Sequence, residues 1–198
     1  VPDVDHTDYL MMLGANPYAS NGSLCTSPDF PGRIQAIRAR GGKVVVVDPR
    51  RTKTAEESDE WISIRPGTDG LFLAAMVNVM FAENLVSIEP RIASLLNGVD
   101  ELRDAVAAFT PAAVQEVTGV SAETTTRLAR ELCGAPTAAV YGRIGVNTVE
   151  FGTTNAWLID AINVLTGNID SRGGAMFTTP GTGSSTTRGA AGKGKGFA

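Results

Sequence analysis

Two short apolar segments constrain the fold more strongly than any other feature of the sequence. Residues 9–13 read Tyr-Leu-Met-Met-Leu and precede a glycine, and residues 43–47 read Lys-Val-Val-Val-Val and precede Asp-Pro. Such segments are typical of strands buried on both faces, as in parallel sheets. Between them, residues 31–40 place apolar side chains at helical spacing before a Gly-Gly pair, which favours a helix that ends there. These elements predict a strand–helix–strand unit.

The alternation of strand and helix patterns continues along the chain. Residues 61–64 alternate as a third strand, and residues 137–141 form a fourth. Residues 71–84 would place apolar side chains on almost every face of a helix, which predicts a buried helix. Thr68 and Asp69 are its candidate caps.

Helical patterns fill residues 87–134, so we predict a helical insertion there. Asp100 is expected to cap one of its helices, Thr110 opens another before a proline, and Ser121 starts a third. A further helix is expected from about residue 153 to residue 165.

Together these patterns predict an α/β fold, a Rossmann-like open parallel sheet with helices on both faces. The first domain is expected to span residues 1–141, with the helical insertion at 87–134. Residues 142–198 are expected to begin a second α/β domain. Its last segment, 178–198, is rich in glycine and threonine and has Phe197 as its one large apolar side chain, so we expect it to be extended or to depend on neighbours.

The composition excludes several classes of function. The 198 residues carry a net charge of −4, with 43% hydrophobic and 19% charged residues, as in an ordinary globular protein, and nucleic acid is not expected as a partner. The longest nearly apolar stretch, 71–81, is too short to span a bilayer, so no direct membrane insertion is expected. No signal-peptide pattern opens the sequence; the compartment stays open, with the cytoplasm favoured over export.

Few residues suited to catalysis or metal binding stand out. Cys25 and Cys133 lie far apart, which indicates two buried or half-buried thiols rather than a disulfide or a zinc site. The other expected positions are an exposed turn for His6, the core for Trp61 and Trp157, and a solvated surface for the acidic residues within 56–60.

Polar or glycine-rich segments follow all four predicted strands. In open parallel sheets, ligands bind outside the carboxyl ends of the strands. Asn-Pro, Pro-Gly and Asp-Pro are each common in turns, but four such ends in one sheet favour a ligand crevice. The segments are 14–21, 48–54, 65–69 and 142–145.

The chemistry of these segments suits a guanine nucleotide. The Asp69 carboxylate can accept hydrogen bonds from N1 and the exocyclic amine of guanine, and Asp48 can accept from ribose hydroxyls. Arg50 and Arg51 can bind a diphosphate or stack on the base. For Arg51, a position on a solvent-exposed basic surface is an equally good interpretation. The loop at Gly14 can approach a phosphate closely. An NAD site fits poorly, because no G-x-G-x-x-G motif follows the first strand.

Four motifs in order resemble those of the molybdopterin oxidoreductases of the dimethyl sulfoxide reductase and formate dehydrogenase type. The resemblance extends from residue 5 to about residue 177, and it is specific as a set. The motifs are 13–21 (Leu-Gly-Ala-Asn-Pro-Tyr-Ala-Ser-Asn), 47–55 (Val-Asp-Pro-Arg-Arg-Thr-Lys-Thr-Ala), 64–69 (Ile-Arg-Pro-Gly-Thr-Asp) and 165–174 (Leu-Thr-Gly-Asn-Ile-Asp-Ser-Arg-Gly-Gly).

This resemblance implies a molybdenum or tungsten enzyme whose metal is held by the dithiolenes of two molybdopterin guanine dinucleotides. One nucleotide would lie along this domain, and no catalytic residue or metal ligand is assigned to the chain. By motif, Asn16 and Ser20 would face the ribose or phosphates, Asp48 and Arg50 the guanosine, Gly67 and Asp69 the guanine, and Gly142 and Gly145 the pterin end.

The chain also departs from the family pattern. Members usually carry an upstream cysteine cluster for a 4Fe-4S centre and a metal-ligating residue, and they continue for hundreds of residues. We therefore expect an internal fragment of a catalytic subunit, such as that of a formate dehydrogenase or a nitrate reductase, which is inactive alone. Its partners would be the rest of its polypeptide and electron-transfer subunits. Two alternatives stay open: a noncatalytic homologue within a respiratory assembly, and a generic or thiamin-enzyme-like nucleotide-binding domain.

Overall fold

The computed structural model describes residues 1–23, 25 and 27–177 and contains a four-stranded, fully parallel sheet. This confirms the predicted fold class. The third strand is shorter than predicted, because its pairing with the second strand ends where that strand ends, at Val47. In the order β3-β2-β1-β4, the strands are β3 (Glu60–Ile62), β2 (Lys43–Val47), β1 (Tyr9–Leu13) and β4 (Ala138–Gly142).

The register brings all four carboxyl ends to one edge of the sheet. Leu13 lies opposite Val47 on one side and Gly142 on the other, and Val47 lies opposite Ile62. The chain adds β2 and β3 on one side of β1 and then returns to place β4 on the other side. The sheet therefore has its topological switch point between β1 and β4, where ligands of open α/β sheets bind.

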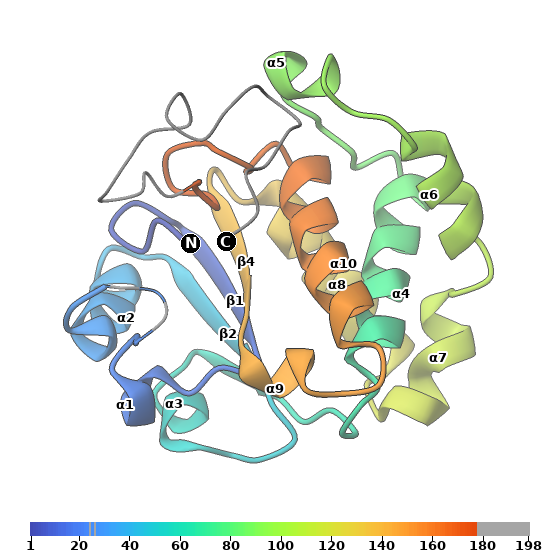
Figure 1. Cartoon of the computed structure of the whole chain (residues 1–198). Helices are drawn as coiled ribbons and strands as arrows, with labels where there is room; N and C mark the ends of the chain where they lie inside the picture. Colours follow the sequence, from blue (N-terminus) through green and yellow to red (C-terminus); the bar gives the residue numbers. More distant parts are fainter. Residues whose placement is uncertain (24, 26, 178–198) are drawn as a thin grey trace, which may run out of the picture.

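Alternate side chains of each strand pack into separate cores on the two faces of the sheet. On one face, Leu10 and Met12 pack with the buried side of α2 (Phe30–Ala39). On the other, Met11 and Leu13 join a larger core. Helices therefore cover both faces, as predicted (Figure 1). The helices of the larger core are α4 (Asp69–Ala82), α8 (Ala122–Gly134) and α10 (Gly152–Leu165).

Residues 87–134 contain four helices, and two of the three predicted helix starts are confirmed. The Thr110 and Ser121 side chains accept from the N–H groups of Ala113 and Thr124. The prediction for Asp100 is wrong, because the helix cap lies two residues earlier, at Gly98 with a φ of +85°, and Asp100 lies in the first helical turn. The helices before α8 are α5 (Pro90–Ala93), α6 (Val99–Val106) and α7 (Pro111–Thr118).

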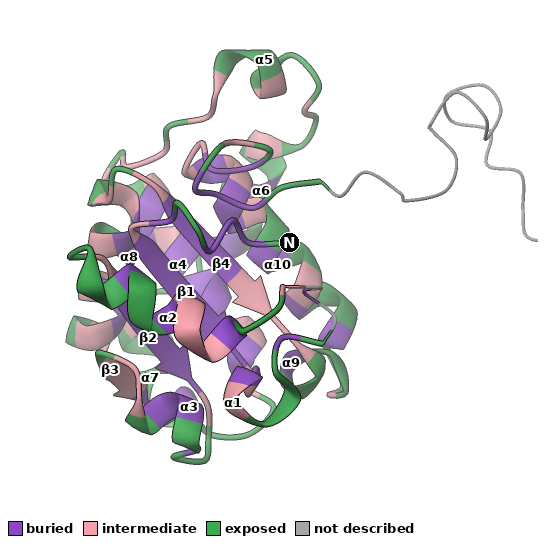
Figure 2. Cartoon of the chain, turned by 90° about the vertical axis from the view of Figure 1, so that its left-hand side faces the viewer, coloured by how far each residue is buried: buried purple, intermediate pink, exposed green. Residues whose placement is uncertain are grey.

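Three single-turn helices follow strands β1, β2 and β4 at the carboxyl edge and lie together at the bottom of Figure 1. They are α1 (Pro17–Ser20), α3 (Lys53–Glu56) and α9 (Ile144–Asn147). Figure 2 shows the strands buried at the centre, with exposed positions on the surrounding helices and loops. No helix in the described ranges is long and apolar enough to cross a membrane. The expectation for residues 178–198 concerns a segment outside those ranges.

Candidate functional site

The loops that follow β1 and β4 pack backbone against backbone at the switch point. A Cβ atom on Gly14 would lie 2.7 Å from the Val146 nitrogen, and one on Gly145 would lie 2.8 Å from the Gly14 Cα atom. Gly14 has a φ of +56°, a conformation that favours glycine. Its N–H donates to the Val47 carbonyl at 3.1 Å, and its carbonyl accepts from Gly145 at 3.2 Å. These glycines thus fix the floor of the crevice.

The two other predicted glycines differ in their surroundings. A Cβ atom on Gly142 would collide with the Ile159 side chain on α10, so this position serves the packing of β4. Gly67 lies in the exposed loop before α4 with a φ of +79°, and a Cβ atom there would meet nothing within 4 Å. Space for a ligand therefore lies beside Gly67.

Asn16 ties the loop after β1 to the helix after β2. Its Oδ1 accepts from the Thr54 hydroxyl at 2.6 Å, and the Thr54 oxygen accepts from the Tyr18 N–H at 3.2 Å. The carboxamide nitrogen of Asn16 has no acceptor in the described part of the chain, so it can donate to a ligand. Ser20 is exposed at the end of α1.

Asp48 and Arg50 form a tight turn at the end of β2. An Asp48 carboxylate oxygen accepts from the Arg50 N–H at 2.8 Å, and the Asp48 carbonyl accepts from the Trp61 indole at 2.8 Å. Trp61, predicted in the core, is only partly buried, and the Arg51 guanidinium lies 5.8 Å from its ring centroid. The turn therefore presents an acid, two arginines and an aromatic ring at the edge of the crevice.

Asp69 is a buried carboxylate without a cationic partner. It begins α4 and is 5% exposed. Within the described ranges, its side chain makes no ion pair and no hydrogen bond to another residue. Burial raises the pKa of Asp69 above its ordinary value, and the charge of nearby Asp48 raises it further. Such a carboxylate is suited to a neutral ligand that donates hydrogen bonds.

Arg143 is a residue of this edge that the sequence reasoning missed. Its Nη1 donates to the Tyr141 hydroxyl at 3.2 Å, and its Nε is buried without an acceptor among the described residues. Asn16, Ser20, Tyr141 and Arg143 line one small cavity of about 10 Å³. The available signal was an arginine directly after the β4 pattern, within a glycine-flanked segment.

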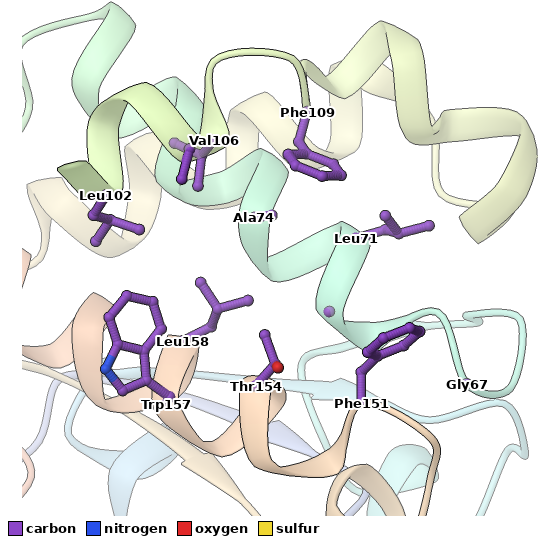
Figure 3. Close-up of a pocket in the computed structure, with 12 residues that line it drawn as sticks. Gly67, Leu71, Ala74, Leu102, Val106, Phe109, Phe151, Thr154, Trp157 and Leu158 are labelled. Carbon is purple, nitrogen blue, oxygen red and sulfur yellow. The ribbon is translucent and has the colours of Figure 1, made fainter.

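An apolar groove of about 420 Å³ lies between α4, α6 and α10 and extends to Gly67 and Gly70, on either side of Asp69 in the chain (Figure 3). Phe109, Phe151 and Trp157 line it, and Thr154 is the one hydrogen-bonding side chain other than Trp157 in its lining. The prediction that Trp157 lies in the core is wrong. Leu158 and its inward-facing neighbours already fill the side of α10 that faces the sheet, so Trp157 is 55% exposed. This lining suits apolar contacts rather than a charged nucleotide.

The two cysteines occupy the expected environments. Cys25 is buried and Cys133 is half-buried. Burial raises the pKa of both thiols, that of Cys133 to about 11. His6 is exposed, as predicted, and its Nδ1 lies 2.9 Å from the Asp3 carboxylate. Within the described ranges, no three His, Cys, Asp or Glu residues gather as a metal site.

Comparison with known sequences identifies related proteins. The sequence model of the molybdopterin oxidoreductase family matches residues 1–195. The chain is 31% identical over 169 residues to formate dehydrogenase H of Escherichia coli, covering 85% of this chain and 23% of the relative. It is 29% identical over 173 residues to the F420-dependent formate dehydrogenase subunit alpha of Methanocaldococcus jannaschii, covering 87% of this chain and 25% of the relative.

Other relatives and one solved structure extend the comparison. Dimethyl sulfoxide reductase DmsA of Haemophilus influenzae is 31% identical over 197 residues, which cover 87% of this chain and 23% of that protein. Acetylene hydratase from Pelobacter acetylenicus has the same fold, with a TM-score of 0.73 and 23% identity over 84% of this chain and 22% of that one. The chain thus spans about a quarter of the length of the curated relatives it matches.

Proposed function

The chain belongs to the molybdopterin oxidoreductase family, and from that premise we propose that its strand-end crevice holds the guanosine end of a molybdopterin guanine dinucleotide. The chain would be part of a molybdenum or tungsten oxidoreductase of the formate dehydrogenase type, the class of two relatives described above. When bound, the cofactor supplies the redox chemistry through its metal and dithiolenes. The residues of this chain bind and orient it.

The observation that carries this proposal is the buried carboxylate of Asp69, which has no hydrogen-bond or ion-pair partner in any other described residue. Guanine presents two adjacent donors, the N1 hydrogen and the exocyclic amine, and a carboxylate accepts from both. Adenine presents an unprotonated N1 at the corresponding position, so it pairs poorly with a carboxylate. Gly67, two residues before Asp69, has open space beside it, which leaves room for a base next to the start of α4.

The remaining polar residues of the crevice fit the rest of a guanosine nucleotide. We assign Asp48 and Arg50 to the guanosine and Asn16 and Ser20 to the ribose or phosphates. The nitrogen of the Asn16 carboxamide supports its assignment, since its oxygen is already occupied by Thr54. Gly142, which ends β4, and Gly145, in α9, are assigned to the pterin side from the family resemblance alone, because Cβ atoms there would meet Ile159 and Gly14 of the chain itself.

Activity, substrate and partners belong to the whole protein. We propose that the chain works with further segments of its own polypeptide and with electron-transfer subunits, and that a 4Fe-4S cluster is carried outside it. Its described residues cradle a cofactor, so the 198-residue chain alone is expected to have no oxidoreductase activity. Formate is the substrate class proposed first, because two relatives named above are formate dehydrogenases.

A nucleotide titration of the 198-residue chain tests this proposal. Isothermal calorimetry should show GDP binding more tightly than ADP. Asp69→Asn should lower GDP affinity about 10- to 100-fold, because one of the base donors loses its acceptor at a cost of about 1–3 kcal/mol. The same variant should melt no lower than the parent, because it removes a buried charge that no cationic side chain among the described residues neutralises.

Asp104→Asn is the matched control, since it makes the same change at an exposed carboxylate on α6. It should leave both affinities unchanged. Equal affinity for GDP and ADP, or GDP binding unaffected by Asp69→Asn, would refute the assignment of Asp69 to guanine.

A further inference from the structure

Both backbone polar groups of Asp48 form hydrogen bonds to β3, the neighbouring strand. Asp48 directly follows β2, and its N–H donates to the Ile62 carbonyl at 3.1 Å. Its carbonyl accepts from the indole N–H of Trp61 at 2.8 Å. One of the two bonds therefore comes from a side chain, so the position of Asp48 depends on the indole of Trp61.

Two contacts hold the Trp61 indole in place. The ring packs against the core that contains Leu10 and Met12, on the side of the sheet covered by α2. The Arg51 guanidinium lies over the ring, 5.8 Å from its centroid, where a cation and an aromatic face attract each other. The N–H donor of Trp61 is thus fixed at the end of β2.

The carboxylate of Asp48 keeps one oxygen for a ligand. The other oxygen accepts from the Arg50 N–H at 2.8 Å. Within the described ranges, no further group donates to this carboxylate. In nucleotide sites of open α/β sheets, an acid near a strand end accepts from ribose hydroxyls. Because the Asp side chain is short, the backbone of Asp48 determines where its free oxygen points.

We propose that Trp61 is a positioning residue, whose indole N–H fixes the Asp48 backbone so that the carboxylate accepts from the ribose hydroxyls of a guanine nucleotide. In this role Trp61 does not touch the ligand. The inference rests on the proposed function, which assigns Asp48 to the guanosine, and adds the residue that orients this carboxylate. The base is bound by Asp69, so the two contacts can be measured separately.

The test compares GDP with dideoxy-GDP, which lacks both ribose hydroxyls, by calorimetry on the 198-residue chain. The parent should bind GDP about tenfold or more tightly than dideoxy-GDP, as expected for hydrogen bonds to a charged group. Trp61→Phe keeps an aromatic ring but removes the N–H donor. It should lower this preference at least about threefold and leave the affinity for dideoxy-GDP within about twofold.

Two control variants accompany Trp61→Phe. Trp157→Phe makes the same change at an exposed ring on α10 and should change neither affinity. Asp48→Asn should itself lower the preference for GDP over dideoxy-GDP. Adding Trp61→Phe to Asp48→Asn should lower the preference no further, because both changes act through one contact. A further loss in the double variant would show that Trp61 acts through another group and would overturn the inference.

The outcomes also separate this inference from the proposal on which it rests. If Trp61→Phe weakens GDP and dideoxy-GDP equally, Trp61 has only a structural role and the inference is overturned, while the guanine site stands. If the parent binds both nucleotides equally, Asp48 does not bind the ribose and the inference also falls. The comparison of GDP with ADP then still tests the guanine site. If no guanine nucleotide binds the parent, the proposed function falls as well.

A measurement on the parent chain keeps the test decisive if Trp61→Phe does not fold. The indole N–H resonance of Trp61 should shift at saturating GDP and shift less at saturating dideoxy-GDP, because its acceptor belongs to the residue that binds the ribose. The indole resonance of Trp157, the second of the two tryptophans, should shift with neither nucleotide. Equal shifts of the Trp61 resonance with both nucleotides, or no shift with GDP, would overturn the inference.

Discussion

The charged residues at the two edges of the sheet differ in their ion pairing. At the amino edge, Lys43 at the start of β2 pairs with Glu60 at the start of β3 at 2.9 Å and with Glu131 of α8 at 2.7 Å. Arg127 pairs with the same two carboxylates. The Tyr9 hydroxyl, at the start of β1, donates to Glu131 at 3.2 Å. The charged residues of this edge are therefore paired with one another.

At the carboxyl edge, the charged side chains lack ion-pair partners. None of the six forms an ion pair within the described ranges, whereas Lys43, Glu60, Arg127 and Glu131 at the amino edge are paired with one another. A protein can leave charges unpaired beside one another where a ligand completes them. The comparison therefore indicates that the carboxyl edge is the binding edge. The six residues are Asp48, Arg50, Arg51, Arg65, Asp69 and Arg143.

The largest effect on stability is expected at a glycine of the carboxyl edge. Gly14→Ala should lower the free energy of unfolding by about 2–4 kcal/mol, because a Cβ atom there meets the Val146 backbone in a left-handed conformation. Gly41, near the amino edge, has a φ of +88° but open space around it. Gly41→Ala should therefore lower the free energy of unfolding by only about 1–2 kcal/mol. Urea unfolding of both variants measures the difference. If both variants lost the same free energy of unfolding, the close backbone contact at Gly14 would not contribute to stability.

A smaller effect is expected from the ion pairs of the amino edge. Glu131→Gln should lower the free energy of unfolding by about 1 kcal/mol, since the group is partly exposed and water screens its pairs. GDP affinity should not change, because Glu131 lies at the opposite edge from Asp69. Glu116→Gln, at an exposed position on α7, is the control and should change neither quantity. Weaker GDP binding in Glu131→Gln would contradict the separation of the two edges.

The two edges should also respond differently to acid. Burial alone would raise the pKa of Glu60, but hydrogen bonds from Arg127 and Lys43 hold it below its usual value of 4.5. A lowered pKa in the folded state adds stability above pH 4.5 that is lost as the pH falls through the lowered value. Asp69 shifts the other way, because its burial raises its pKa above 3.8. Its protonated form cannot accept from both guanine donors.

GDP affinity should therefore fall on acidification, by up to about tenfold per pH unit below the raised pKa of Asp69. The ion pairs of the amino edge should survive through this range, because their carboxylates protonate at lower pH. Titrations between about pH 4 and pH 8, with circular dichroism at each pH, measure both. Asp69→Asn should lose this dependence and keep only the part that comes from titration of the terminal phosphate of GDP. A profile that kept its slope in this variant would assign the pH dependence to another group.

The backbone arrangement was largely predictable because burial acts on the sequence pattern directly. Residues 9–13 and 43–47 are apolar on both sides of the pleat, and only a strand covered on both faces buries all of those side chains. The caps at Thr110 and Ser121 were predictable for a similar reason, since a local hydrogen bond determines them.

What escaped prediction depends on contacts between distant segments. The acidic run at 56–60 reads as a solvated surface, yet Glu60 meets Arg127 only because α8 folds back onto the amino edge. Trp157 fits an apolar helix pattern, but the side of α10 that it occupies faces a groove rather than the core. Arg143 became notable only once β4 was placed beside β1. The cofactor-binding roles proposed for nine residues stay predictions. These residues are Gly14, Asn16, Ser20, Asp48, Arg50, Gly67, Asp69, Gly142 and Gly145.

Mapping the GDP site on the 198-residue chain by amide chemical shifts tests the central claim most directly. GDP should shift the amides of the carboxyl edge and leave those around Lys43, Glu60 and Glu131 unchanged. Shifts confined to the amino edge or to the part of the apolar groove formed by Leu102, Phe109 and Trp157, or no shifts at saturating GDP, would contradict the account. The segments expected to respond are 14–20, 48–50, 67–70 and 142–145.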